Sequence, residues 1–157
     1  MESALTITSE PSAARMKEIV TELAAVKSRQ DIDAALRIYH PDAELLSPPM
    51  GTCYQGEQAL REGLVRFFRF APDYQVRVAS MAVEGDTLCA WGEIAFSPTY
   101  SRRGRLEHIR MIRTPVFILF RFCDEQVIWE SFHFDLADLA RQAGVPAEWF
   151  QPVEAAS

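Results

Sequence analysis

Residues 127–144 of the chain read VIWESFHFDLADLARQAG, and this stretch decides the fold. Apolar and polar residues alternate as far as Asp135, which is typical of a β-strand and puts Ser131, His133 and Asp135 on one side of it. From there the apolar residues recur at helical spacing until a glycine ends the helix. The sequence therefore predicts a carboxylate at a strand–helix junction, on the same side as a histidine.

Two interpretations of this carboxylate follow from the residues. An apolar pocket disfavours the ionised form of a carboxyl group and so tunes it for proton transfer, which would make Asp135 a general acid/base. His133 could approach the same ligand, because Cβ atoms two residues apart on a strand are roughly 6–7 Å apart. Alternatively, Asp135 caps the following helix and His133 lies on the sheet surface or in an interface. The direction of the Asp135 side chain distinguishes these interpretations.

The remaining pattern predicts an α+β fold in one domain over residues 11–150, between a flexible N-terminus (1–10) and a tail (151–157). A strongly curved sheet with helices across its concave side encloses a cone-shaped cavity, which suits a small molecule. The predicted elements are helices over 11–28, 31–40 and 56–70, strands over 43–46, 74–83, 87–97 and 105–122, a loop at 47–51, a hairpin turn at 84–86 and a longer turn at 98–104. Pro115 marks a bulge or an edge in the longest strand.

Composition narrows the classes of partner. The net charge of −6 argues against nucleic acid, because phosphate binding needs a basic surface. Cys53, Cys89 and Cys123 form no CxxC motif, so neither a disulfide framework nor a cysteine zinc site is expected. The apolar runs are too short for a membrane span, and the N-terminal residues lack the pattern of a signal peptide. We therefore expect a cytoplasmic protein without metal, nucleic-acid or membrane partners.

Several short segments together resemble a known family, the SnoaL-like polyketide cyclases of the nuclear transport factor 2-like superfamily. The similarity runs from about residue 31 to residue 144. It implies a cone-shaped α+β barrel with a curved, mostly antiparallel sheet, helices packed on its concave face, and a homodimer or higher oligomer. The residues that carry it are Tyr39-His40-Pro41-Asp42, Gly56, Pro72-Asp73, Glu84-Gly85-Asp86 and, most specifically, Ile128, Glu130, Asp135, Leu139, Arg141-Gln142 and Gly144.

The resemblance also implies a chemistry. In the cyclases, the acid that matches Asp135 is the proposed general acid/base of an intramolecular aldol closure that needs no metal or cofactor. The family also uses a pocket histidine, for which His133 and His108 are the candidates, while the position first aligned with it holds Arg121.

This chain lacks the acidic residues that two other reactions of the superfamily require. Ketosteroid isomerases carry an aspartate before a proline in the loop after the first strand, where this chain has Ser47-Pro48. Limonene-type epoxide hydrolases use an Arg-x-Asp pair, and the triplets that begin at Arg110, Arg113 and Arg121 end without an acid. The sequence therefore argues against both activities.

The leading hypothesis is a cofactor-independent enzyme of polyketide-like biosynthesis, an aldol cyclase that uses Asp135 and His133 on an apolar substrate. The alternatives are a hydroxylase or isomerase on the same scaffold, or a non-catalytic binding or accessory protein. The residues expected to contact the substrate are Tyr39, Phe67, Trp91, His108 and Trp129.

For the charged residues outside this site, the sequence mainly predicts structural roles. Glu130 is predicted to form a cross-strand ion pair with Arg113 or Arg121, with substrate binding as the alternative. Arg102, Arg103 and Arg105 are expected in a solvated turn, or as a patch that attracts an anionic substrate or carrier protein. Apolar side chains on the convex sheet face would favour a homodimer.

Overall fold

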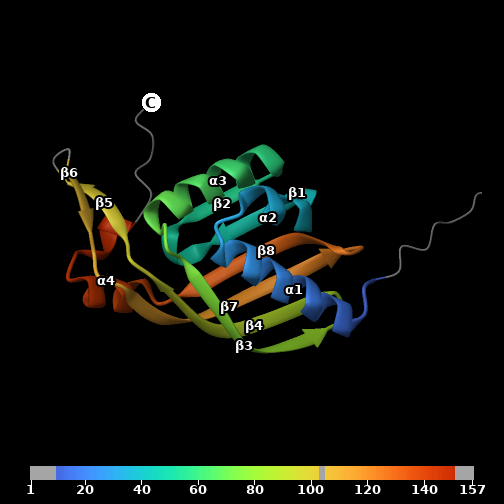
Figure 1. The fold of residues 1–157 in the computed structure, drawn as a ribbon. Helices are drawn as coiled ribbons and strands as arrows, with labels where there is room; N and C mark the ends of the chain where they lie inside the picture. The colour runs from blue at the N-terminus through green and yellow to red at the C-terminus, as the bar shows by residue number, and fades with distance from the viewer. Residues whose placement is uncertain (1–9, 103–104, 151–157) are drawn as a thin grey trace, which may run out of the picture.

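The computed structural model describes residues 10–102 and 105–150, with the side chains of residues 100–108 left aside. It shows a curved sheet with helices on its concave side (Figure 1). The elements, in chain order, are α1 (Ala13–Ser28), α2 (Ile32–Ile38), β1 (Tyr39–Ser47), the 3-10 turn η1 (Pro48–Met50), β2 (Thr52–Gln55), α3 (Glu57–Phe70), β3 (Gln75–Glu84), β4 (Thr87–Phe96), β5 (Thr99–Arg102), β6 (Arg105–His108), β7 (Ile112–Cys123), β8 (Gln126–Phe134), α4 (Leu136–Ala143) and the 3-10 turn η2 (Ala147–Phe150).

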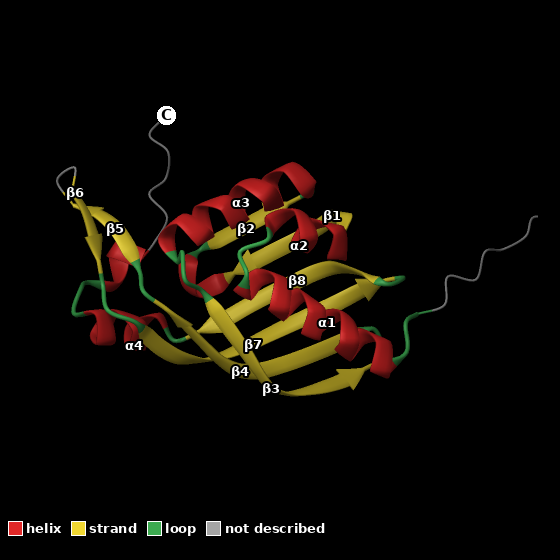
Figure 2. Ribbon diagram, in the orientation of Figure 1, coloured by secondary structure: helices red, strands yellow, loops and turns green. Residues whose placement is uncertain are grey.

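Six strands form the main sheet in the order β2-β1-β8-β7-β4-β3. All neighbouring strands pair antiparallel except β1 and β8, which run parallel. Figure 2 shows the sheet curving under α1, α2 and α3, while the β5–β6 hairpin extends beyond it beside α4. This architecture confirms the predicted cone-shaped α+β barrel.

The core lies between the helices and the concave face of the sheet. On β7 every second residue from Ile112 to Phe122 is buried, because a strand presents alternate side chains to opposite faces. On α3 the buried residues Leu60, Leu64 and Phe68 recur every four residues and face that sheet. Each such side chain contributes about 1.5–3 kcal/mol by leaving water.

The sequence predicts one continuous strand over residues 105–122, and this prediction is wrong. The chain forms β6 (Arg105–His108), leaves the strand conformation at 109–111, and starts β7 at Ile112. The expected longer turn at 98–104 is instead largely β5 and β6, which pair with each other. Apolar content alone did not reveal that the chain changes sheets at this point.

The N-terminal part of the sheet is also longer than predicted. β1 begins at Tyr39, four residues before the predicted strand at 43–46, and the loop at 47–51 contains η1. The short strand β2 (Thr52–Gln55), which pairs with the end of β1, was not predicted. Four mixed residues carry too little periodicity to distinguish a strand from a loop.

Pro115 lies at an edge, one of its two predicted settings. β8 ends at Phe134, which pairs with Val116, so Pro115 pairs only with Glu93 of β4. A proline is tolerated here because the other side of β7 has no neighbouring strand in need of its missing N–H.

Some sequence-based expectations lie outside the described residues. They are the flexibility of residues 1–9, the tail at 151–157 and the position of Arg103. None of the helices described is both long and apolar enough to span a membrane.

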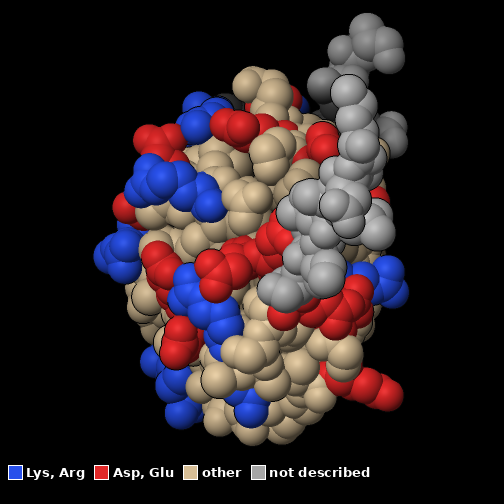
Figure 3. All heavy atoms as spheres, turned by 90° about the vertical axis from the view of Figure 1, so that its right-hand side faces the viewer, with Lys and Arg blue, Asp and Glu red and all other residues tan. Residues whose placement is uncertain are grey.

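Acidic and basic side chains alternate over the end of the barrel that carries the start of α1 and the β7–β8 turn (Figure 3). At this end Arg15 forms ion pairs with Glu18 and with Glu125 of that turn, at 3.2 Å and 2.9 Å. Among the described residues that Figure 3 leaves visible, this face therefore has no broad basic area of the kind that nucleic-acid backbones need.

Candidate functional site

A cavity of about 270 Å³ lies between α3, β1, the β8 strand and η2. Its volume suits a ligand of one or two rings. Most of its wall is apolar, and η2 closes one side, where the rings of Phe70 and Phe150 meet edge-to-face at 5.6 Å. The apolar lining residues are Leu45, Leu46, Met50, Gly63, Leu64, Phe67, Phe68, Phe70, Phe132, Trp149 and Phe150; the polar ones are Lys27, Ser47, Thr52, Tyr54, Arg66, Tyr74 and Glu130.

A glycine on α3 shapes this cavity. A Cβ atom at Gly63 would lie 2.6 Å from a ring carbon of Tyr54. The Tyr54 ring therefore packs directly on the helix backbone and forms part of the cavity wall. Glycine inside a helix costs about 1 kcal/mol relative to alanine, and here it makes room for the aromatic ring.

The most buried charge in the cavity wall is Glu130, which is only 1% exposed. Lys27 of α1 donates hydrogen bonds to both carboxylate oxygens, at 2.8 Å and 3.0 Å, and Tyr39 of β1 donates to one of them. The Lys27 ammonium also lies 5.4 Å from the centre of the Tyr39 ring. A buried carboxylate is stable in this setting because a cation and a phenol, which together donate three hydrogen bonds, replace its hydration.

The predicted pairing of Glu130 with Arg113 or Arg121 is therefore wrong. Alternation along β8 points the carboxylate to the concave side, where only an element that crosses that face can reach it. Arg113 instead pairs with Glu93, at 3.2 Å, and Arg121 lies 4.8 Å above the ring of Trp129. These arginines belong to the opposite, convex face.

Two buried phenols stand beside this carboxylate. Burial first, and the negative charge of Glu130 second, hold the pKa of Tyr39 and that of Tyr74 well above the ordinary value of 10.0. Both side chains are 2% exposed. Both phenols therefore keep their protons throughout the physiological pH range, and that of Tyr39 is donated to Glu130.

Alkaline unfolding should report on these two phenols. Below pH about 10 the folded and unfolded chains both keep these protons, so the stability is unaffected. Above it the unfolded chain releases protons that the folded chain retains, so the free energy of unfolding falls by about 1.4 kcal/mol per pH unit for each phenol. Tyr39→Phe and Tyr74→Phe should each reduce this slope in urea unfolding measured above pH 10. An unchanged slope in both variants would contradict the assigned burial.

Asp135 caps α4. Its carboxylate accepts a hydrogen bond from the backbone N–H of Asp138 at 3.0 Å, the side chain is exposed, and the residue is not part of the cavity lining. The position thus agrees with the helix-cap interpretation and offers no contact with a ligand in this cavity.

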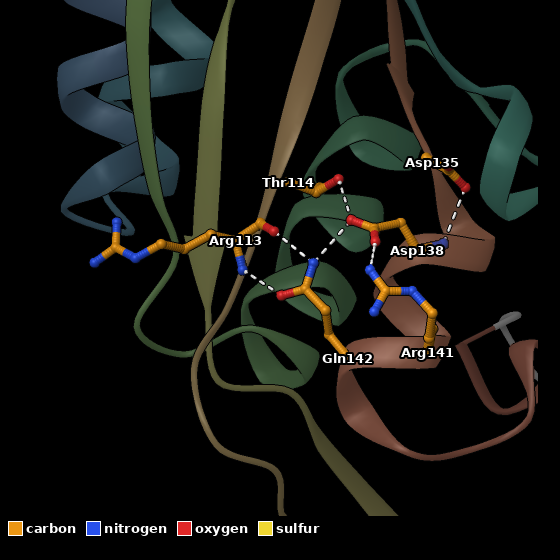
Figure 4. Close-up of polar contacts among 6 residues, drawn as sticks. All are labelled: Arg113, Thr114, Asp135, Asp138, Arg141 and Gln142. Carbon is orange, nitrogen blue, oxygen red and sulfur yellow. Dashed lines mark hydrogen bonds and ion pairs between the residues drawn. The ribbon is translucent and has the colours of Figure 1, made fainter.

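The residues that follow Asp135 dock α4 onto β7 (Figure 4). The Gln142 side chain accepts from the backbone N–H of Arg113 at 3.2 Å and donates to the carbonyl oxygen of Arg113 at 2.7 Å. Asp138 accepts from Gln142, Thr114 and Arg141, and the bonds from Arg141 and Gln142 lower the pKa of Asp138. Asp135, Arg141 and Gln142, which carry part of the family resemblance in the sequence, thus belong to a structural junction.

His133 lies on the other face of β8. Its Nε2 is 2.7 Å from the Ser131 hydroxyl, and strand alternation separates both from Glu130 and Phe132, which line the cavity. The structure therefore brings Ser131 and His133 together, as predicted, but does not place His133 or Asp135 at the cavity.

The five predicted substrate contacts occupy different places. Phe67 lines the cavity, and Tyr39 lies behind Glu130 as its hydrogen-bond donor. Trp91 and Trp129 are outside the cavity lining, on the convex face, where Trp91 is 36% exposed. His108 belongs to β6, and its side chain is outside the described part of the structure.

Neither Lys27 nor Tyr74 is recognisable as a site residue from the sequence alone. Lys27 is near the end of a helix whose pattern is an ordinary apolar stripe. Tyr74 comes directly after the Pro72-Asp73 loop, at the start of a predicted strand. A usable signal was present in Glu130, an acid within an aromatic strand and on the opposite side from the polar residues of that strand. Among the described residues, no three His, Cys, Asp or Glu side chains gather as metal ligands.

Comparison with known proteins agrees with the fold. Residues 20–130, well over half of the chain, match the family described as SnoaL-like domain. The chain belongs to the SnoaL-like family. The matched segment of this SnoaL-like protein ends at Glu130, before the α4 junction begins at Asp135. No curated protein matches the chain.

Solved structures share the fold of this SnoaL-like protein. A proposed SnoaL-like polyketide cyclase from Jannaschia sp. CCS1 has a TM-score of 0.74 and 20% identity over 88% of this chain and 99% of that chain. AclR from Streptomyces galilaeus, a proposed hydroxylase, has a TM-score of 0.70 and 18% identity over 86% of this chain and 100% of its own. A protein of ketosteroid isomerase-like fold from Catenulispora acidiphila, in complex with trimethylamine, has a TM-score of 0.70 and 19% identity. The match covers 84% of this chain and 96% of that chain. At these identities the likeness establishes the fold alone.

Proposed function

We propose that this SnoaL-like protein is an enzyme of small-molecule biosynthesis that binds an apolar, polyketide-like substrate in the cavity and transfers protons through Glu130. The observation that carries the proposal is a buried carboxylate in the wall of an aromatic cavity, held by Lys27 and Tyr39. The leading reaction is an intramolecular aldol closure without cofactor. We further propose that residues 11–150 act as a single domain in the cytoplasm.

The hydrogen-bond capacity of Glu130 is compatible with this role. A carboxylate offers about four acceptor positions, and Lys27 and Tyr39 occupy three. In the closure, Glu130 takes a proton from the carbon next to a ketone, and the resulting enolate carbon attacks a second carbonyl to form a carbon–carbon bond. The proton then goes to the new alkoxide, and loss of water gives a cyclic enone. No oxidant or reductant is required, since every atom of the substrate ends in the enone or in water.

A pair of matched variants tests which acid transfers the proton. We use 1-phenylhexane-1,5-dione, which closes to 3-phenylcyclohex-2-enone, and follow the ultraviolet absorbance of the conjugated product. Glu130→Gln should lower turnover by at least about 100-fold, because general-base catalysis contributes 10²–10⁴-fold. Asp135→Asn, which preserves a good helix cap, should leave turnover unchanged.

The opposite pattern would return the acid/base role to Asp135. Equal turnover by both variants and the unaltered protein would rule out proton transfer by either residue. Urea unfolding of each variant provides the folding control, because an unfolded Glu130→Gln would lose activity for a trivial reason.

A second function has support from the same residues. Because three donor hydrogen bonds already engage Glu130, the ion pair could serve only to fix α1 on the sheet while the cavity binds a ligand without reacting it. A non-catalytic binding or accessory protein would then retain ligand affinity in Glu130→Gln and show no turnover in either form.

We also propose that two copies pair through the convex face of the sheet. Phe117 is 55% exposed and pairs with Trp91 across β7 and β4, so both rings contact water in the single chain. Phe117→Asp should convert a dimer to a monomer in sedimentation velocity. Met111→Asp is the control, because Met111 is 46% exposed but lies outside the strand. A chain that is monomeric before substitution would contradict the pairing.

A further inference from the structure

The hydroxyl group of Tyr74 has no hydrogen-bond partner among the residues that the structure describes. The side chain is 2% exposed and lines the cavity. No fully enclosed side-chain nitrogen or oxygen of the described residues is left unpaired, so this unpaired hydroxyl must reach the open volume of the cavity. A hydroxyl that is removed from bulk water and left without a protein partner is available to a ligand.

The rest of Tyr74 is held firmly. Its ring lies edge-to-face with that of Phe67, with centroids 5.0 Å apart, and packs beside Phe96 at 6.3 Å. Its backbone N–H donates to Ala71 at 3.2 Å, and its carbonyl oxygen accepts from the Gln30 side chain at 2.7 Å. The hydroxyl is therefore a donor in a fixed position, which is what oriented binding of a ligand requires.

The neighbouring charge determines the kind of ligand group. Burial raises the pKa of Tyr74, and the carboxylate of Glu130 is close enough to raise it further. The phenol thus keeps its proton and can donate it, so an acceptor atom of a ligand would complete its hydrogen bonding. In an apolar cavity the suitable acceptor is a carbonyl oxygen, which gains negative charge when the adjacent carbon loses a proton.

We infer that Tyr74 donates a hydrogen bond to a ketone oxygen of the ligand and stabilises the enolate that forms there. This inference rests on the proposed function, in which Glu130 removes the proton from the carbon beside that ketone. The two residues line one cavity, so one substrate can contact both of them, with the base at the carbon and the donor at the ketone oxygen. The resulting substrate class is an aryl or cyclic ketone small enough for the cavity.

Two probes of equal shape test the inference without any turnover. They are 2-acetylnaphthalene and 2-isopropenylnaphthalene, which both carry a planar side group and differ only in a carbonyl oxygen in place of a CH₂ group. The unaltered protein should bind the ketone about fivefold more tightly in isothermal titration calorimetry, which is the effect of one net hydrogen bond. In Tyr74→Phe the two dissociation constants should become equal, through a loss of ketone affinity.

Thr21→Val is the matched control. Thr21 is on α1 and outside the cavity lining, and its hydroxyl donates to the carbonyl oxygen of Lys17 at 2.8 Å, so the preference for the ketone should survive the loss of this hydroxyl. A preference that persists in Tyr74→Phe, or that disappears equally in Thr21→Val, would overturn the inference. Urea unfolding shows whether each variant retains its fold.

The test of the Tyr74 donor role can fail or succeed independently of the test of proton transfer by Glu130. If Glu130→Gln turns the diketone over at the original rate while Tyr74→Phe abolishes the ketone preference, the proton-transfer role is wrong and the donor role stands. If neither probe binds the unaltered protein, the assignment of the cavity as a ligand site fails, and the donor role fails with it.

Discussion

Lys27→Met is expected to lower the free energy of unfolding by about 3–5 kcal/mol at neutral pH. The substitution keeps most of the length of the side chain and removes its charge, which leaves the carboxylate of Glu130 buried with Tyr39 as its one remaining donor. The Lys27 side chain is itself only 12% exposed, so water cannot readily replace the ammonium. Urea unfolding followed by tryptophan fluorescence measures the effect.

Two further variants make this result specific. Arg61→Met breaks the ion pair with Asp33, whose N···O distance is also 2.8 Å but whose side chains are 41% and 71% exposed, and should cost no more than about 1 kcal/mol. Adding Glu130→Gln to Lys27→Met should restore most of the loss, because a neutral amide oxygen can still accept from Tyr39. Equal effects of Lys27→Met and Arg61→Met would show that Glu130 is well hydrated.

Gly92→Ala is expected to destabilise the fold by at least about 3 kcal/mol. A Cβ atom on Gly92 would lie 1.9 Å from the carbonyl oxygen of Arg77 in β3, opposite the register shift between Val78 and Ser80. The obstructing atom belongs to the backbone, so the two strands must separate or the bulge must be lost. Urea unfolding should show the loss, and circular dichroism should show whether the sheet persists.

A glycine in the same hairpin provides the comparison. Gly85 forms the β3–β4 turn with a φ of 60°, and nothing lies within 4 Å of a Cβ placed on it. Gly85→Ala should therefore cost only the left-handed backbone penalty of about 1–2 kcal/mol. If Gly92→Ala were no worse than Gly85→Ala, the close approach of the two strands would be disproved.

Local patterns predicted the elements whose periodicity is long and regular. The helix ending at Phe70, the Glu84-Gly85-Asp86 turn and the junction at Asp135 all lie where the sequence placed them. The errors came where pairing depends on distant residues. β2 forms because β1 offers it an edge, and β5 and β6 form because they pair with each other away from the main sheet.

The site was harder to predict than the fold. The sequence predicts a catalytic site on the face of β8 with Ser131, His133 and Asp135, because these polar groups are close in sequence. The cavity, however, lies on the other face of β8. The sequence predicts an ion pair between Glu130 and an arginine of the adjacent strand, because neighbouring strands commonly form such pairs. Only the path of α1 across the concave face brings Lys27 to it, and no local pattern encodes that crossing.

The distance along the chain between Lys27 and Glu130 has a consequence for synthesis. Their contact joins residues 103 positions apart, and the parallel pairing of β1 with β8 closes a similarly long loop. Such contacts form only after the entropy of loop closure has been overcome, so the final assembly step should be slow compared with helix formation. On the ribosome, Lys27 of α1 therefore lacks its carboxylate partner until β8 emerges. A chain that stops before β8 lacks the centre of the sheet and is expected to need a chaperone or to be degraded.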